Sequence, residues 1–356
     1  MASRLTTVLA VFLAFLMVIS VGGVTAQDAR PVAKGDRALS ITVTVPEDGE
    51  YEPAFAIAQD AGMDEIELTF RWDELETAPG EYVGDGLAAV NQFYPARGMP
   101  VSLMVAPLSS VEKSVPADLA GVAFDDPAFI ERYQRLLDFV FGALPDVEIP
   151  TLVIGLEVES HLLANAEGWA QYERFYAAVA DYARTLRPGL RVGVEGLQIN
   201  ILGPAAGYFD VLNAHSDFVA VSYFPLDEAG MGRPLDGIAA EFDALTAHYP
   251  DQTIRFTQLC YPSSAVNDSS VQMQAQFVRE VFAAWDDHAE QIERIEFTWL
   301  HDLSPEGVEA FSALFQHQNE QFAAFLGTVG LRTYPSAGQD KPALDALREE
   351  AAARGW

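Results

Sequence analysis

The chain contains 356 residues, with 52 acidic against 21 basic side chains and a formal net charge of −31. This excess of negative charge argues against nucleic acid and anionic membrane surfaces as partners. Cys260 is the only cysteine, so the chain forms no intrachain disulfide.

The N-terminal residues predict an export signal. Arg4 precedes an apolar run over residues 5–21, and the small-residue sequence Val24-Thr25-Ala26 follows. These features are typical of a secretory signal peptide, residues 1–26, that is cleaved after Ala26. We therefore expect a secreted or periplasmic protein that has no membrane anchor after cleavage. Residues 27–38 are expected to form a loose N-terminal arm.

From residue 39 onward the apolar pattern alternates between strands and helices. The expected strands are 39–45, 66–72, 100–107, 151–154, 190–196, 218–223, 253–259 and 295–300. Helical periodicity lies between them, for example after Asp126, which is expected to cap a helix with Pro127 in its first turn. A C-terminal helix is expected within 341–356.

This alternation predicts the fold class. Eight strand–helix units over this length, without a linker or an internal repeat, favour a single-domain (β/α)8 TIM barrel over residues 39–356. An open doubly wound sheet that binds a dinucleotide is disfavoured, because no Gly-rich phosphate loop follows the first strand.

Residues 151–162, TLVIGLEVESHL, contain the first candidate for a functional side chain. The short apolar run at 151–154 is typical of a strand buried on both faces. Glu157 follows it by a few residues. Because functional residues in parallel α/β folds lie at the carboxyl ends of strands, we expect Glu157 to belong to a site there.

Several segments near the expected strand ends match known motifs. RWDELETAPGEY, at 71–82, is similar to W-x-x-[LI]-E-P-x-x-G-x-[YF]; LVIGLEVESHL is similar to a fourth-strand G-N-E-V motif; and FTQLCYPSS, at 256–264, is similar to T-E-x-G-Y-P-S. DFVAVSYFPL, FTWLHD and GLRTYPSAGQDKPALDAL match further strand ends and a common chain ending. In this order the motifs resemble clan A glycoside hydrolases, most nearly the arabinogalactan endo-β-1,4-galactanases, and cover most of residues 39–356.

The resemblance implies a role for each matching residue. Glu157 corresponds to the acid/base glutamate of the family. Tyr223 corresponds to the sixth-strand tyrosine, and Trp299 to the aromatic floor beneath the sugar at the cleavage point. Arg71 corresponds to an arginine near the nucleophile. The implied partner is therefore a carbohydrate.

Two positions depart from the family pattern. Leu156 stands where the family has a sugar-binding asparagine, and Gln258 stands where it has the nucleophilic glutamate. A retaining glycosidase needs two carboxyl groups about 5–5.5 Å apart, one as acid and one as nucleophile. An amide is a poor nucleophile and carries no charge to stabilise the transition state, so we expect the usual double displacement to fail.

Three functions stay open on these residues. In the first, the chain binds a polysaccharide or oligosaccharide in a cleft around Glu157, with stacking faces from the aromatic residues Trp72, Tyr223, Tyr261 and Trp299. In the second, it is a hydrolase. In the third, it is a catalytically inactive secreted interaction or structural protein with no sugar ligand.

The hydrolase has two forms. An inverting enzyme would place a second carboxylate about 6.5–9.5 Å from Glu157. The candidates for that group are Glu159, Glu195, Glu296 and Asp302. In the other form, Gln258 orients a substrate 2-acetamido group that acts as the nucleophile.

Other chemistries find little support. His161, His301 and Asp302 follow neither HExxH nor another metal-ligand spacing, so we expect hydrogen-bonding roles and no metal. The G-x-S-x-G motif of serine hydrolases does not occur. We expect no cofactor.

Overall fold

The computed structural model describes residues 31–316 and 318–356, and residues 32–356 form one compact unit. The predicted signal peptide, residues 1–26, and the first residues of the predicted arm lie outside the described residues.

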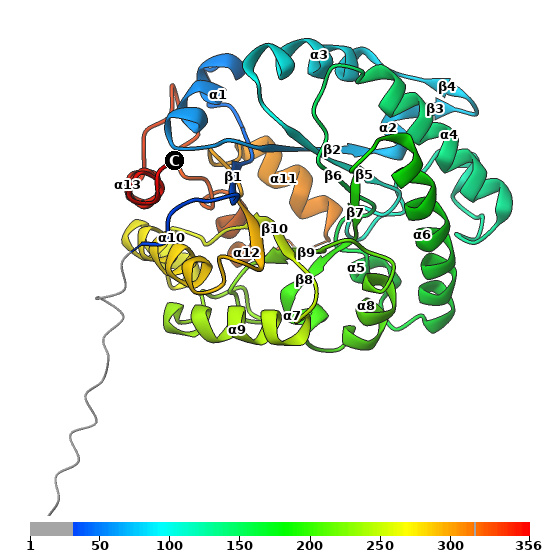
Figure 1. Ribbon diagram of the computed structural model, residues 1–356. Helices are drawn as coiled ribbons and strands as arrows, with labels where there is room; N and C mark the ends of the chain where they lie inside the picture. Colours follow the sequence, from blue (N-terminus) through cyan, green and yellow to red (C-terminus); the bar gives the residue numbers. More distant parts are fainter. Residues whose placement is uncertain (1–30, 317) are drawn as a thin grey trace, which may run out of the picture. The chain divides into compact units, whose positions relative to one another are not determined.

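The strands form two parallel sheets that together make the barrel (Figure 1). One sheet has the order β2-β5-β6-β7 and the other β1-β11-β10-β9-β8. The nine strands are β1 (Ala38–Ile41), β2 (Ile66–Arg71), β5 (Val101–Ala106), β6 (Thr151–Val153), β7 (Arg191–Gly193), β8 (Glu195–Leu197), β9 (Val219–Tyr223), β10 (Ile254–Leu259) and β11 (Ile292–Phe297).

Eight strand positions result, because β7 and β8 are two halves of the fifth predicted strand, interrupted at Val194. Next to β1, the amide of Asp64 donates to the carbonyl of Leu39 at 3.0 Å, which joins the chain just before β2 to the other sheet. The prediction of a (β/α)8 barrel is confirmed.

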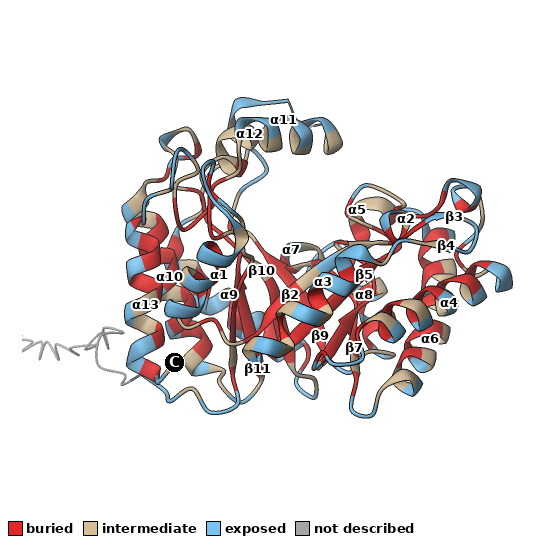
Figure 2. Ribbon diagram, turned by 90° about the horizontal axis from the view of Figure 1, so that it is seen from above, coloured by how far each residue is buried: buried red, intermediate tan, exposed pale blue. Residues whose placement is uncertain are grey.

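Helices surround the strands (Figures 1 and 2). The predicted cap is present, since the Asp126 side chain accepts from the amide of Ala128 at 2.8 Å. The outer helices are α1 (Tyr51–Asp60), α3 (Asp85–Phe93), α4 (Pro127–Ala143), α6 (Ala166–Leu186), α8 (Ala206–Asn213), α9 (Ile238–His248), α10 (Val271–Asp287) and α13 (Pro342–Arg354).

Several elements at the carboxyl ends of the strands were not predicted. They are the helices α2 (Trp72–Leu75), α5 (Glu159–Leu162), α7 (Gln198–Ile201), α11 (Pro305–Leu314) and α12 (Glu320–Leu326), and the hairpin of β3 (Glu76–Ala78) and β4 (Glu81–Tyr82). Helices α11 and α12 lie between β11 and α13 in sequence and stand above the barrel in Figure 2. Four short 3-10 turns are Pro95–Arg97, Ala117–Leu119, Leu235–Gly237 and Ala265–Asn267.

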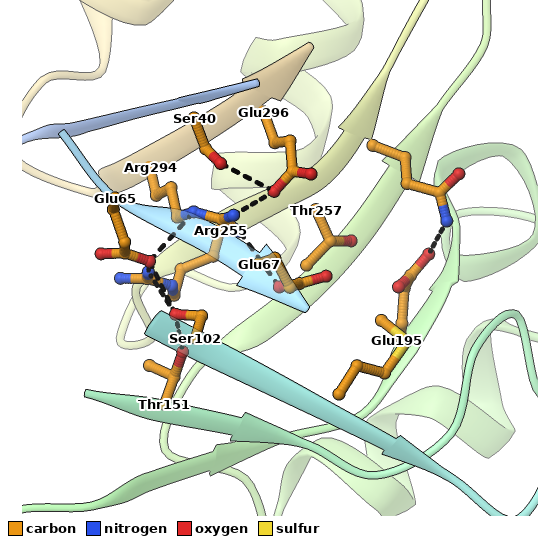
Figure 3. Close-up of polar contacts among 12 residues, drawn as sticks. Ser40, Glu65, Glu67, Ser102, Thr151, Glu195, Arg255, Thr257, Arg294 and Glu296 are labelled. Carbon is orange, nitrogen blue, oxygen red and sulfur yellow. Dashed lines mark hydrogen bonds and ion pairs between the residues drawn. The ribbon is translucent and has the colours of Figure 1, made fainter. Parts of the chain in front are cut away.

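A network of charged side chains fills part of the barrel interior (Figure 3). Arg294, which is fully buried, lies 3.0 Å from Glu65 and 3.1 Å from Glu67 and also pairs with Glu296. Arg255 pairs with the same oxygen of Glu65. Since these residues lie on β2, β10 and β11 or directly beside β2, the network joins strands of both sheets.

The described part of the predicted arm is held in place. The guanidinium of Arg37 donates to Asp286 at 3.0 Å, and the amide of Lys34 donates to the carbonyl of Arg354 at 2.8 Å. These contacts fasten it to α10 and α13, so the expectation of a loose arm is wrong for these residues. Within residues 31–316 and 318–356, each helix is too short or too polar to cross a membrane.

Candidate functional site

A strained turn after β6 positions Glu157. Gly155 has φ +95°, and a Cβ there would lie 2.3 Å from the hydroxyl of Tyr172, which itself donates to the carbonyl of Ile154 at 2.9 Å. Glu157 also has a positive φ, 44°, which is uncommon for a residue with a side chain. Strain of this kind persists where the surrounding structure enforces it and is frequent at functional sites.

Ser110 holds the Glu157 carboxyl group. Its hydroxyl donates to Glu157 Oε2 at 2.8 Å, and its amide donates to the carbonyl of Leu156 at 2.8 Å. Ser110 has φ 50°, so two strained residues meet at this hydrogen bond. Ser110 could not be predicted from the sequence, because no motif or spacing marks it and only the fold brings the loop after β5 against Glu157.

Burial raises the pKa of Glu157, and the hydrogen bond from Ser110 opposes this shift. The side chain is only 7% exposed. A carboxyl group with a raised pKa holds its proton at higher pH and is suited to act as an acid.

Glu195, which does not line the cavity, binds the side-chain amide of Gln258. Its Nε2 donates to Glu195 Oε1 at 3.3 Å, and Ser222 donates to the same oxygen. Glu195 is fully buried, and burial together with the nearby Glu157 raises its pKa well above the usual value. Figure 3 shows Glu195 apart from the Arg294 network. With its nitrogen engaged, Gln258 keeps its carbonyl oxygen as an acceptor.

A cavity of about 580 Å³ lies over these groups. Its lining includes Ser110, Glu157, Ser160 and Gln258, which we call the polar end, together with the half-buried Trp299. The structure therefore brings Glu157, Gln258 and Trp299 together, as the sequence analysis expected. Glu195 acts on Gln258 and contributes no surface to the lining.

The remaining cavity surface is mostly apolar. Leu156, Val111 and Leu163 lie in the lining, and aromatic and aliphatic residues from the loop after β9 and from the α11–α12 segment complete it. We call this second group the apolar wall: Phe224, Leu226, Phe311, Phe315, Phe322 and Phe325.

Three aromatic residues that were expected to stack on sugar are buried in the core. Trp72 is 0% exposed and donates to Glu76 at 2.7 Å. Tyr223 and Tyr261 are each 1% exposed, and their hydroxyl groups donate to Glu241 and to the carbonyl of Arg233. These expectations are wrong, because the rings fill space between the barrel and its helices and present no face to a ligand.

Arg71 also differs from its expected place. Its guanidinium pairs with Asp73 at 2.9 Å and with Glu112 at 2.8 Å, and it does not contact Gln258. Since Glu112 belongs to the same loop as Ser110, Arg71 steadies the loop that holds Glu157.

The other candidate carboxylates are engaged elsewhere. Glu159 accepts from the amide of Leu197 at 2.8 Å, and its burial raises its pKa to about 7. Glu296 lies in the Arg294 network, and Asp302 pairs with Lys341 at 2.6 Å. None of these three forms part of the cavity lining.

The histidines make hydrogen-bond contacts. His301 Nδ1 lies 2.8 Å from the carbonyl of Thr44, and His161 Nδ1 lies 3.1 Å from that of Val111. In the described part of the chain, no group of three or more His, Cys, Asp or Glu residues is arranged to hold a metal ion.

Comparison with known proteins finds fold relatives only. No family model and no curated protein matches the chain. Among solved structures, a family 5_18 glycoside hydrolase variant from Bifidobacterium longum subsp. longum, in complex with Manβ1-4GlcNAc, is similar with a TM-score of 0.70 and 15% identity over 89% of this chain and 78% of that one.

Two further structures have the same fold. The exo-β-1,4-mannosidase Op5Man5 from Opitutaceae bacterium strain TAV5 has a TM-score of 0.69 and 13% identity, covering 89% of this chain and 59% of its own. The family 53 catalytic domain from Ignisphaera aggregans has a TM-score of 0.59 and 16% identity, covering 92% and 97%. The chain thus has the barrel fold of clan A glycoside hydrolases.

Proposed function

We propose that this chain binds a carbohydrate at the polar end of the cavity. The observation that carries the proposal is that Glu157, Gln258 and Trp299 line one cavity of suitable size. A concave site with few convergent polar groups and an aromatic ring is typical of small-ligand recognition. The saccharide named with the Bifidobacterium structure, Manβ1-4GlcNAc, is a first ligand to test, and β-1,4-galactan oligosaccharides are a second.

Glu157 acts in this proposal as a protonated acid. Its raised pKa supports the role of hydrogen-bond or proton donor to a glycosidic oxygen. The amide of Gln258 forms no glycosyl ester, so the chain does not hydrolyse its ligand by double displacement.

A second candidate function is supported by the orientation of Gln258. Because its Nε2 donates to Glu195, its carbonyl oxygen is left to accept a hydrogen bond in the cavity. A substrate 2-acetamido N–H is a fitting donor. Its acetamido oxygen would then attack the anomeric carbon while Glu157 protonates the leaving oxygen.

We also propose that the protein is exported, on the basis of the signal sequence at residues 1–26. Mass spectrometry of the protein after expression in a secreting host tests this proposal. A mature N-terminus at Gln27 is expected, and retention of residues 1–26 would contradict it.

The proposed function is tested by calorimetric binding and by reducing-sugar release with the unmodified protein, Glu157→Ala and Gln258→Glu. We expect the unmodified protein to bind at least one of the two saccharides without releasing sugar, and Gln258→Glu to gain release. Hydrolysis by the unmodified protein that needs Glu157 but no 2-acetamido group would overturn the assignment as a binding protein. Absence of any saccharide binding would overturn the proposed function itself.

The second candidate needs its own substrate pair. If it holds, the unmodified protein cleaves 4-nitrophenyl N-acetyl-β-glucosaminide and leaves 4-nitrophenyl β-glucoside intact. Equal rates on the two substrates, or no cleavage of either, would exclude acetamido participation.

A further inference from the structure

The apolar wall forms a continuous row of rings that begins beside the polar end. Trp299 and Phe311 have ring centroids 5.7 Å apart, and Phe311 lies 6.4 Å from Phe315. Phe315 is followed by Phe322 at 5.7 Å. The row continues from Phe322 to Phe325 at 6.3 Å and from Phe325 to Phe224 at 6.0 Å.

These phenylalanines are only partly covered by the protein. Helix α11 has no buried residue, and Phe311, Phe315, Phe322 and Phe325 are all half-buried. Apolar side chains of an ordinary amphipathic helix pack into a core, as those of α4 and α10 do. The aromatic residues of α11 and α12 instead line the cavity. The apolar surface of Phe311, Phe315 and Phe325 is therefore available to a ligand.

Leu163 gives an independent indication on another part of the lining. It is 70% exposed and has φ 47° and ψ −133°, which is an unfavourable conformation for a leucine. Its amide donates to the carbonyl of Glu159 at 2.8 Å, and its carbonyl accepts from the indole of Trp169 at 2.9 Å, so the conformation is enforced. An apolar side chain is thus held in the cavity despite strain and exposure.

A long saccharide fits this surface poorly. Each sugar hydroxyl that leaves water needs a hydrogen-bond partner, and the apolar wall supplies none. The polar side chains near it are few. The carboxylate of Asp227 already accepts from the amides of Ala229 and Met231 at 2.9 Å each, and the side-chain oxygen of Asn319 already accepts from the amide of Phe322 at 2.7 Å. Glu228 and Gln321 also lie in the lining. Leu156, which also lies in the lining, adds no polar partner.

We propose that the ligand is a glycoside with a bulky apolar aglycone, such as an alkyl chain of about eight carbons or more, and not a polysaccharide. The inference rests on the proposed function, since the sugar occupies the polar end next to Glu157 while the aglycone lies along the apolar wall and Leu163. Because one cavity carries both surfaces, an amphiphilic glycoside is the occupant that satisfies all of it.

The test is a chain-length series measured by calorimetry or tryptophan fluorescence. Methyl, hexyl, octyl and decyl β-D-mannopyranosides, and the matching β-D-glucopyranosides and β-D-galactopyranosides, are titrated below their critical micelle concentrations. We expect affinity to increase about threefold for each methylene that is buried, and so about thirtyfold or more from methyl to octyl if at least about three of the added methylenes are buried. An affinity that does not depend on chain length would overturn the inference and leave carbohydrate binding intact.

Variants locate the effect. Leu163→Ser and Phe325→Ser should each reduce the octyl-over-methyl gain in affinity about threefold to tenfold and leave methyl glycoside affinity unchanged. Val211→Ser, a 51% exposed apolar residue of α8 outside the cavity lining, is the matched control and should change neither. If Val211→Ser were the only variant to lose the octyl-over-methyl gain in affinity, the assignment of the aglycone to the apolar wall and Leu163 would be contradicted.

1-Octanol separates the two proposals. Affinity for 1-octanol at least tenfold weaker than for an octyl glycoside supports the inference. Equal affinities would show that the sugar contributes nothing, and would overturn both the glycoside and the proposed carbohydrate function.

Discussion

Glu157, Glu195 and Gln258 form a small group in which burial favours the protonated form of both carboxyl groups. Burial raises the pKa of both Glu157 and Glu195, and no arginine or lysine is among the groups that shift either one. Both shifts reduce the negative charge that the two carboxyl groups carry next to the amide at a given pH. Such a site is suited to hydrogen bonding with a neutral sugar more than to stabilising a cationic transition state.

Glu195→Gln tests the neutral state of Glu195. Because a protonated carboxyl and an amide have similar size and charge, the substitution should change the free energy of unfolding at pH 7 by less than about 1 kcal/mol. Glu76→Gln is the control, since Glu76 is equally buried but pairs with Arg132 at 2.9 Å. It should lose roughly 2 kcal/mol or more. Urea denaturation of both variants measures the difference, and an equal loss in the two would contradict a neutral Glu195.

At the scale of elements, the turn between β6 and α5 depends on a glycine. Gly155 has φ +95°, and a Cβ at this position would lie 2.3 Å from the Tyr172 hydroxyl, so there is no room for a side chain. The same turn sets the direction of Glu157, so stability and binding are linked there.

Gly155→Ala should destabilise the protein by roughly 3 kcal/mol, through strain at positive φ and overpacking, and should abolish saccharide binding. Gly142→Ala is the control. Gly142 lies in α4 with open space around it, and alanine there should be neutral or stabilise by up to about 1 kcal/mol. Urea denaturation and calorimetry measure the two effects. Unchanged stability in Gly155→Ala would contradict the described turn.

The α11–α12 segment shows why helices can escape detection. Its apolar residues line a cavity, so their spacing along the sequence does not follow the one-sided apolar stripe of a helix that packs on the core. Residues 305–326 also follow the eighth strand. After this strand a (β/α)8 barrel needs only one more helix, and α13 is that helix. Prediction of the barrel was therefore complete without this segment.

At the scale of the whole molecule, the buried charge network links global stability to pH. Burial raises the pKa of Glu67 to about 8, and Glu296 adds to the shift while Arg294 opposes it. The folded state thus holds this proton more tightly than the unfolded chain. Between about pH 4.5 and 8 the contribution of Glu67 to stability therefore declines as pH rises, by roughly 1 kcal/mol per pH unit.

Glu67→Gln removes this titration. The free energy of unfolding of the variant, relative to that of the unmodified protein, should increase by more than about 1 kcal/mol between pH 5.5 and 8.5. Urea denaturation at the two pH values measures it. Leu68→Val on the same strand should shift stability equally at both. A pH-independent difference for Glu67→Gln would show that its carboxyl is already ionised at pH 5.5.

The fold class, the order of the strands and the place of Glu157, Gln258 and Trp299 could be predicted from the sequence, because strand periodicity and strand-end position are local properties. The sequence could not place Trp72, Tyr223 and Tyr261, since an aromatic ring near a strand end packs inward or outward according to neighbours that are distant in sequence. Only the tertiary structure brought Ser110 to Glu157, Glu195 to Gln258, and the phenylalanines of α11 and α12 to the same cavity. These contacts join separate strands and βα loops, and they meet because the two parallel sheets place the carboxyl ends of their strands at one end of the barrel.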